Sequence, residues 1–252
     1  MVNESPWLLL PVETKAREFH AKLLLAALAV ERGYRVVLGE QNAMVRQISH
    51  LPRGLYVDKS IAKTKTKHFQ QLRQQGNKVA AWCEEGLVYR DRDAYLRQRI
   101  DLASLAEADR FFCWGEVQRA NIAGKARREA AKLVATGNPR FDLLRPGYRG
   151  LFADEAQTLR DRHGDFILIN TNFARYNHFY GEDYLLQSQR HRGTVEGAED
   201  EAFLLAWRDF LGQMYHGFAA MLEPLSKAFP KYKIILRPHP SENHQRWMAE
   251  CD

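Results

Sequence analysis

The sequence predicts an α/β protein in which parallel sheets are covered by helices and divided between two domains. Short apolar runs rich in β-branched and aromatic residues alternate with longer amphipathic segments, which is the pattern of strand–helix–strand units. A Pro- and Gly-containing stretch at 139–150 interrupts the alternation before it resumes. The 252 residues, 45% hydrophobic and 27% charged, have an ordinary globular composition and are enough for two domains.

The first domain is expected to span residues 1–145 and to hold six strands. Because each strand is followed by a helical segment, the sheet should be parallel and Rossmann-like, with right-handed crossovers. Neither GxGxxG nor GxxxxGK[ST] occurs, so a standard dinucleotide site or P-loop is not expected. The predicted strands are 7–13, 34–39, 54–57, 78–83, 111–115 and 133–137; the predicted helices are 15–32, 43–50, one ending at Gly76, 91–108 and 116–132.

Residues 146–164 are expected to form a linker and a helix, and residues 165–252 the beginning of a second Rossmann-like domain. Only two strands are predicted in it, at 165–172 and around 234–236. Because the mean sheet has about five or six strands, this second domain is expected to be truncated. The aperiodic segment 174–200 is predicted to be a long loop of the kind that forms lids. A helix over 201–229, broken near Gly212, Gly217 or Pro224, and a terminal helix complete the prediction.

Charge and cysteine content restrict the classes of function. Lys and Arg number 37 against 31 Asp and Glu, and this net charge of +6 suits an anionic substrate or a peripheral contact with an anionic membrane surface. No nucleic-acid-binding signature appears, so nucleic acid is not expected as a partner. The three cysteines lack metal-ligand spacing, which predicts reduced thiols in a cytoplasmic protein without a metal site. No apolar run is long enough to span a bilayer.

The segment Arg237-Pro238-His239-Pro240-Ser241 is the first candidate binding site. It follows a predicted strand, which the prolines end because they lack an N–H and fix φ. Ser241 is predicted to be a helix N-cap, so Arg237 and His239 should lie beside a helix N-terminus, where anionic ligands bind. The alternative is a proline-rich loop with a surface histidine. Glu242 follows directly and is included in the predicted site.

The second candidate is Glu84-Glu85-Gly86, at the carboxyl end of a predicted parallel strand, where α/β proteins bind ligands. Adjacent carboxylates repel each other, which raises one pKa and favours a general base. In an extended segment the two side chains point in opposite directions, so at most one faces a cleft. The alternative is that one carboxylate caps the next segment and the other is solvated.

Three further sets of polar residues follow predicted strands. Thr171 and Asn172 come after the first strand of the second domain and could bind a ribose or a phosphate, or could satisfy loop backbone groups. Glu13 and Lys15 follow the first strand of the chain and should lie at the same edge as Glu84 and Glu85. The lysines between 59 and 67 have the pattern of a solvated face, although they could attract an anionic acceptor.

Taken together, these motifs resemble those of bacterial surface carbohydrate biosynthesis proteins, a group similar to GT-B glycosyltransferases. The resemblance covers nearly the whole chain, and the combination of motifs is moderately specific. It rests on their order along the chain: Trp82-Cys83-Glu84-Glu85-Gly86-Leu87, Phe112-Cys113-Trp114-Gly115, Thr136-Gly137-Asn138-Pro139-Arg140-Phe141-Asp142, Ile169-Asn170-Thr171-Asn172-Phe173 and Leu236-Arg237-Pro238-His239-Pro240-Ser241-Glu242.

The resemblance implies a glycosyltransferase of capsule or lipopolysaccharide biosynthesis. A nucleotide-sugar would bind in the C-terminal domain, and a glycan or lipid-linked glycan acceptor against the N-terminal domain. Bacterial sialyltransferases of this fold pair an acidic-Asp-Gly motif with a His-Pro motif that contacts cytidine monophosphate. Glu85 stands at the base position, with Glu84 the second choice, and Glu replaces the family's Asp. His239 would contact the nucleotide, and a CMP-sugar is favoured.

The donor would be a substrate, so no cofactor and no metal are implied. Three alternatives stay open at this point: a UDP-sugar epimerase or hydrolase on the same scaffold, a polyol-phosphate transferase, and a truncated domain without catalytic activity.

Overall fold

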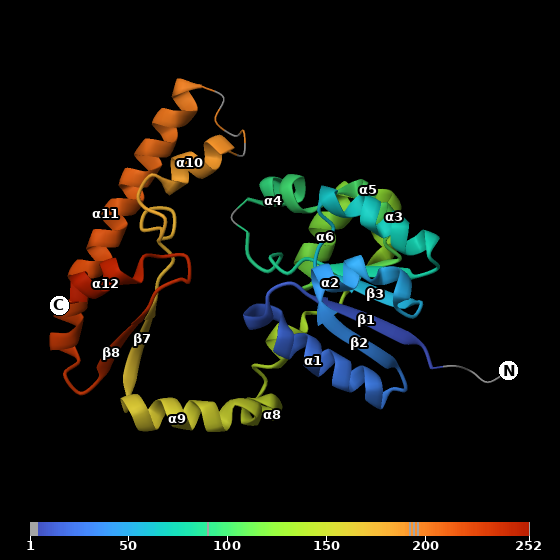
Figure 1. The fold of residues 1–252 in the computed structure, drawn as a ribbon, viewed down its shortest axis with the longest axis horizontal. Helices are drawn as coiled ribbons and strands as arrows, with labels where there is room; N and C mark the ends of the chain where they lie inside the picture. The colour runs from blue at the N-terminus through green and yellow to red at the C-terminus, as the bar shows by residue number, and fades with distance from the viewer. Residues whose placement is uncertain (1–4, 90, 192, 194, 196, 252) are drawn as a thin grey trace. The chain divides into compact units, whose positions relative to one another are not determined.

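The computed structural model describes residues 5–89, 91–191, 193, 195 and 197–251 (Figure 1). They form two compact units that divide between Leu151 and Phe152. Each unit has its own sheet, so each is described by itself.

The first unit is built on a six-stranded, wholly parallel sheet with the order β2-β1-β3-β4-β5-β6, which confirms the predicted α/β, Rossmann-like fold. All six predicted strands are present, most within one or two residues of the predicted bounds. They are β1 (Trp7–Val12), β2 (Arg35–Glu40), β3 (Gly54–Asp58), β4 (Lys78–Trp82), β5 (Arg110–Cys113) and β6 (Leu133–Ala135).

The strand order distributes the helices unevenly over the two faces of this sheet. The step from β1 to β2 runs in one direction and every later step runs in the other. With right-handed crossovers, one face therefore receives the first helix and the opposite face receives the others. The first is α1 (Lys15–Glu31); the others are α2 (Gln41–Arg46), α3 (Thr66–Gln74), α4 (Arg92–Arg99), α5 (Leu102–Glu107) and α6 (Glu116–Lys125).

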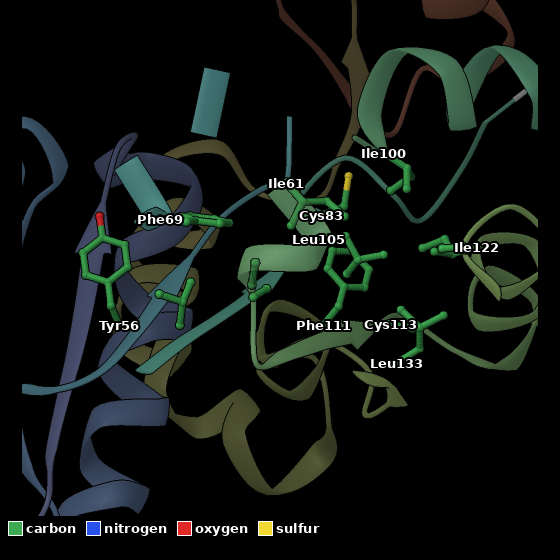
Figure 2. Close-up of a cluster of buried hydrophobic side chains, with 14 of the residues drawn as sticks. Tyr56, Ile61, Phe69, Cys83, Ile100, Leu105, Phe111, Cys113, Ile122 and Leu133 are labelled. Carbon is green, nitrogen blue, oxygen red and sulfur yellow. The ribbon is translucent and has the colours of Figure 1, made fainter. Parts of the chain in front are cut away.

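Two hydrophobic cores follow from this arrangement. The larger fills the face covered by α2 to α6, and Figure 2 shows side chains such as Phe69, Leu105 and Phe111 gathered there. The smaller lies between α1 and the other face, where Leu8, Leu10, Val57, Ala80 and Trp82 meet Ala26 and Ala29. Strand residues buried on both faces are typical of parallel sheets.

Three predicted helices of the first unit are wrong in extent. The helix predicted over 43–50 is α2, which ends at Arg46, followed by a 3₁₀ segment, Ile48–His50. The single helix predicted over 91–108 is divided into α4 and α5, because Ile100 is extended and bridges to Ile61. Asp101 then caps α5 by accepting a 2.8 Å hydrogen bond from the Ser104 N–H. The helix predicted over 116–132 ends with α6 at Lys125, and a 3₁₀ segment, Arg127–Lys132, follows.

The shorter helices of the first unit include two 3₁₀ segments, Ile48–His50 and Lys63–Lys65, the second of which takes up part of the lysine run. After β6 come α7 (Pro139–Asp142) and α8 (Pro146–Arg149) and the 3₁₀ segment Gly150–Phe152.

In the part of the chain that the structure describes, the second unit contains a two-stranded parallel sheet and four helices. Its strands are β7 (Phe166–Asn170) and β8 (Lys233–Arg237); its helices are α9 (Ala153–His163), α10 (Tyr184–His191), α11 (Ala198–Ala228) and α12 (His244–Cys251). Helix α11 contacts both β8 and α12 (Figure 1). Phe173, Tyr215 and Trp247 form the buried centre of this unit, with ring centroids 4.3–6.1 Å apart.

Two predictions for the second unit are corrected. The segment 174–200 is not wholly a loop, because it contains α10 and the start of α11; its residues 192, 194 and 196 lie outside the described residues. Helix α11 is not broken at either glycine or at Pro224. Gly212 serves packing instead: a Cβ there would lie 2.7 Å from the Tyr176 ring, so glycine lets the ring approach the helix.

None of the helices among the described residues combines the length and apolar character that crossing a membrane requires.

Candidate functional site

The Glu84-Glu85-Gly86 loop leaves the carboxyl end of β4, as predicted, and three hydrogen bonds hold its backbone. The indole N–H of Trp114 donates a 2.6 Å hydrogen bond to the Cys83 carbonyl. The Gly86 N–H donates to the same carbonyl at 3.0 Å, and the Glu84 N–H donates to the Lys59 carbonyl at 3.1 Å. The loop is therefore tied to the segments that follow β3 and β5.

Gly86 is required by close packing under this loop. The Gln118 side chain donates a 2.6 Å hydrogen bond to the Tyr95 hydroxyl and accepts a 2.7 Å bond from the Trp114 N–H. A Cβ at Gly86 would overlap the Gln118 amide nitrogen and lie 2.8 Å from the Tyr95 hydroxyl oxygen. Burial raises the pKa of the Cys83 thiol and of the Tyr95 hydroxyl, so both stay protonated at neutral pH. Close packing therefore explains why the third residue of the motif is glycine.

The two carboxylates face different surroundings, as the extended geometry predicts. Glu84 is buried, and its carboxylate lies 3.4 Å from the Arg140 guanidinium. Glu85 is half-exposed and forms ion pairs with Arg99 and, at 3.7 Å, with Arg17. Arginine therefore neutralises each carboxylate, and Glu85 is the one that solvent reaches. Arg140 comes from the Thr-Gly-Asn-Pro-Arg motif, so the structure brings two of the sequence motifs together.

Glu13 and Lys15, the predicted acceptor-side residues, have different surroundings. Glu13 joins the edge through ion pairs with Lys59 and, at 3.4 Å, with Arg17. Lys15 instead lies 5.9 Å from the centre of the Phe19 ring and does not line the cavity beside Glu84 and Glu85. That small cavity is lined by Arg17, Lys59, Ser60, Ala62, Cys83, Glu84, Glu85 and Arg99.

Arg17 and Arg99 are site residues that sequence reasoning missed. Arg17 lies in the first turn of α1 and Arg99 at the end of α4, where charged side chains look like ordinary helix-surface residues. Only the topology brings them to Glu85. Their positions could have identified them, because both arginines lie near helix ends that adjoin the carboxyl edge of the sheet.

A buried ion pair shapes the turn from β1 to α1. Lys22 lies 2.7 Å from the Glu18 carboxylate and also donates to the Pro11 carbonyl. Both side chains are about 1% exposed. Burial opposes the charge on Glu18, but hydrogen bonds from Lys22, the Glu13 N–H and Arg17 outweigh it and lower the pKa of Glu18 to about 2. The carboxylate therefore stays ionised and holds Arg17 at the edge.

In the second unit the Arg-Pro-His-Pro-Ser-Glu loop is organised by Glu242. Its buried carboxylate accepts hydrogen bonds from the Thr171 hydroxyl at 2.8 Å, the His239 N–H at 2.9 Å and the Trp247 indole at 2.8 Å. Glu242 and Thr171 were predicted as ligand contacts, but both are buried and these bonds engage their side chains. They position the loop rather than present free polar groups.

His239 is held in one tautomer. Its Nδ1 accepts a 3.1 Å hydrogen bond from the Ser241 N–H, so in the neutral ring the proton is on Nε2. The side chain is exposed. His239 therefore presents an N–H donor to solvent.

Arg237 lies at the end of β8, and its Nε donates a 2.8 Å hydrogen bond to the Asn170 side-chain oxygen at the end of β7. The terminal guanidinium nitrogens can still donate elsewhere. Asn170 is a further residue that sequence reasoning missed. Asn172, the second polar residue predicted after this strand, is exposed.

The prediction that Ser241 caps the last helix is wrong. Helix α12 begins at His244, and the Asn243 side chain accepts a 3.2 Å hydrogen bond from the Arg246 N–H, so Asn243 is the cap. Ser241 instead orients the imidazole of His239 through its N–H, and its carbonyl accepts from the Phe179 N–H at 3.2 Å.

The fold and these two sites define the class of protein: a Rossmann-like α/β protein with an arginine–carboxylate edge in one unit and a preorganised Arg–His loop in the other. The described residues contain no group of three or more His, Cys, Asp or Glu side chains placed to hold a metal ion. A scan against protein-family models and a search of curated proteins both gave no match to this chain.

Proposed function

We propose that this protein is a GT-B-like glycosyltransferase of bacterial surface polysaccharide biosynthesis. Its donor would be a nucleotide-sugar, with a CMP-sugar favoured, and its acceptor a glycan or lipid-linked glycan. The protein would work in the cytoplasm, with a peripheral contact at the inner face of the membrane. The observation that carries the proposal is the His239 geometry, in which the Ser241 N–H fixes the ring so that Nε2–H points outward.

The loop of the second unit has the chemistry that a nucleotide phosphate needs. Arg237 supplies a cation that Asn170 orients, and His239 supplies a donor whose direction the backbone sets. Charge-assisted hydrogen bonds of this kind stabilise the negative charge that develops on a departing phosphate. Glu242 keeps the loop in place, and its carboxylate accepts hydrogen bonds from the His239 N–H and the Trp247 indole instead of facing the anion.

The arginine–carboxylate edge of the first unit has the chemistry of an acceptor site. Glu85 is the solvent-accessible carboxylate of the motif, so it is the proposed general base, and Glu84 supports the loop through Arg140. Arg17 and Arg99 would hold the Glu85 carboxylate in position until an acceptor hydroxyl replaces one of them. Glu13 and Lys59 extend the polar edge along the neighbouring strand ends.

Calorimetric titration of CMP and of UDP tests the proposal. CMP should bind the wild-type protein, and His239→Ala should weaken its binding tenfold or more, about 1.4 kcal/mol. His239→Gln should keep most of the affinity, because its amide places a donor near the Nε2 position. His191→Ala, a histidine change on α10 outside the loop, is the matched control and should leave binding unchanged.

The outcomes separate the parts of the proposal. Tighter binding of UDP than of CMP would show that the donor is a UDP-sugar and would not contradict the proposed site. Equal CMP binding by wild type and His239→Ala would remove His239 from the site. Failure of both nucleotides to bind the wild-type protein would overturn the proposed function.

A further inference from the structure

Helix α11, the long orange helix of Figure 1, carries a second apolar stripe beside the one that faces its own unit. The inner stripe includes Tyr215, Phe218 and Leu222, which belong to the buried aromatic centre or pack against it. Several residues of the second stripe directly precede these positions in the sequence, so they point about 100° away around the helix. We call the second set the outer stripe: Phe203, Trp207, Phe210, Met214, Gly217 and Met221.

The outer stripe is exposed and has the spacing of a helix-pairing surface. Four of its side chains are between 39% and 66% exposed, namely Phe203, Phe210, Met214 and Met221. Trp207 is partly exposed and contacts Phe210, with ring centroids 5.8 Å apart. The members lie alternately four and three residues apart, which is the spacing by which helices pair in coiled coils. A contiguous exposed apolar surface of this kind marks an interaction site.

Gly217 has no packing role within its own unit. A Cβ at this position would meet nothing within 4 Å among the described residues. Glycine inside a helix is less stable than alanine, so a structural reason for its presence is expected. Facing helices pack well when small residues on one are set against large residues on the other. Because Gly217 lies on the outer stripe, it indicates that a bulky side chain of the partner helix lies against it.

The two ends of α11 carry opposite charges. Its first turn is acidic, with Glu199 and Glu201, and its last turn is basic, with Lys227. A parallel pair of α11 helices would place like charges together at both ends, whereas an antiparallel pair places opposite charges together. The helix dipoles also favour the antiparallel arrangement. A second copy of this chain therefore complements the charge of α11 when the two helices run in opposite directions.

In that orientation the outer stripe is also complementary to itself in shape. Because its spacing reads the same in both directions, one antiparallel register sets every large aromatic side chain against a methionine or the glycine. A two-fold axis repeats each contact. Aromatic rings make favourable contacts with methionine sulfur, and an indole takes the space that a glycine leaves. The facing residues are Phe210 with Met214, Phe203 with Met221, and Trp207 with Gly217.

We propose that the outer stripe is the interface of a homodimer in which two α11 helices pack antiparallel about a two-fold axis near Gln213. The same register places Glu199 beside Lys227 of the second copy, so an ion pair forms at each end of the interface. The interface uses none of the residues of the two candidate sites described above. This inference is therefore independent of the proposed glycosyltransferase function.

Analytical ultracentrifugation tests the dimer. The wild-type protein should sediment as a dimer at about 100 µM and dissociate on dilution. Met214→Glu sets a carboxylate against Phe210 of the second copy on both sides of the axis, so it should raise the dimer dissociation constant about tenfold or more. Met248→Glu, the same change at an exposed methionine of α12, should leave the dissociation constant unchanged. Far-UV circular dichroism should show wild-type helix content in both variants.

Gly217→Ala separates packing at the interface from helix propensity. The new methyl group should stabilise α11 in the monomer but meet the Trp207 indole of the second copy in the dimer, so dimerisation should weaken about fivefold or more. Gly124→Ala on α6 is the matched control. A Cβ at Gly124 also meets nothing within 4 Å, and that variant should dimerise as the wild type does.

Cross-linking tests the antiparallel orientation in a Cys251→Ser background, which removes the exposed thiol and leaves only buried ones. Gln213→Cys places two thiols beside the axis, so a short bis-maleimide reagent should join two chains. Lys227→Cys is the matched control at another exposed position of α11. Its two thiols should not be joined, because about 28 residues of helical rise, roughly 40 Å, separate them in an antiparallel pair.

Three results would overturn the proposal. A wild-type protein that stays monomeric at the highest concentration measured would show that the outer stripe does not pair two copies. A Met214→Glu variant that dimerises as tightly as the wild type would assign the dimer to another surface. Cross-linking of Lys227→Cys as well as Gln213→Cys would show that the helices pair in parallel.

Discussion

The Thr171 hydroxyl donates a 2.8 Å hydrogen bond to the Glu242 carboxylate, which joins the end of β7 to the loop after β8, 71 residues later in the chain. Both side chains are buried. The same carboxylate also accepts from the His239 N–H and the Trp247 indole. One side chain therefore links both strands of the small sheet to the aromatic core and sets the position of His239.

Glu242→Gln should destabilise the second unit by about 2–4 kcal/mol, because one carboxylate oxygen becomes an NH₂ that faces a donor. Urea unfolding followed by tryptophan fluorescence measures the change, since Trp247 is a partner. Glu223→Gln, which removes the exposed ion pair with Lys227 on α11, should change stability by less than about 0.5 kcal/mol. A Glu242→Gln protein as stable as wild type would show that the buried network does not hold the loop.

Gly86→Ala should destabilise the first unit by about 1–3 kcal/mol, because the new methyl group overlaps the Gln118 amide and forces apart the Gln118–Tyr95 hydrogen bond. Gly124→Ala is the matched control. A Cβ at Gly124, inside α6, meets nothing within 4 Å and should stabilise the helix by up to about 1 kcal/mol. Thermal unfolding of the two variants should therefore shift the midpoint in opposite directions, and a shared direction would contradict the packing argument.

The Glu18–Lys22 pair should make stability depend on pH. The folded-state pKa of Glu18, about 2, is below its ordinary value of 4.5, so its contribution is present above about pH 4.5 and is lost as pH falls toward 2. Between about pH 7 and pH 3 the loss should be about 2 kcal/mol. The double variant Glu18→Gln/Lys22→Met should lose correspondingly less stability over that interval in urea unfolding. An identical pH dependence in both proteins would mean that Glu18 has an ordinary pKa when folded.

The strands and their parallel arrangement could be predicted from the sequence because buried parallel strands are short, apolar and regularly spaced, as in Trp7–Val12 and Lys78–Trp82. Helix breaks were harder to predict. Ile100 interrupts a helical pattern because of its bridge to Ile61, a tertiary contact that local periodicity does not encode. Gly212 gave the opposite error, because a glycine that serves packing resembles one that ends a helix.

The candidate site was predictable in its positions and not in its partners. Strand ends identified Glu85, Arg237 and His239, since that edge is set by topology. The sequence could not show that the Thr171 hydroxyl donates a hydrogen bond to the Glu242 carboxylate, because hydrogen bonds between residues 71 apart depend on the fold. Arg17 and Arg99 were missed for the same reason.

Asn170 should act on nucleotide binding only through Arg237. Asn170→Ala removes the 2.8 Å hydrogen bond that orients the guanidinium, and it should weaken CMP binding about fivefold while leaving stability nearly unchanged, because the residue is exposed. Arg237→Ala should weaken binding more, by tenfold or greater. The double variant decides the mechanism: if Asn170 only positions Arg237, Asn170→Ala should have no further effect once the arginine is gone. Additive losses in calorimetric titrations would instead mean that Asn170 contacts the nucleotide itself.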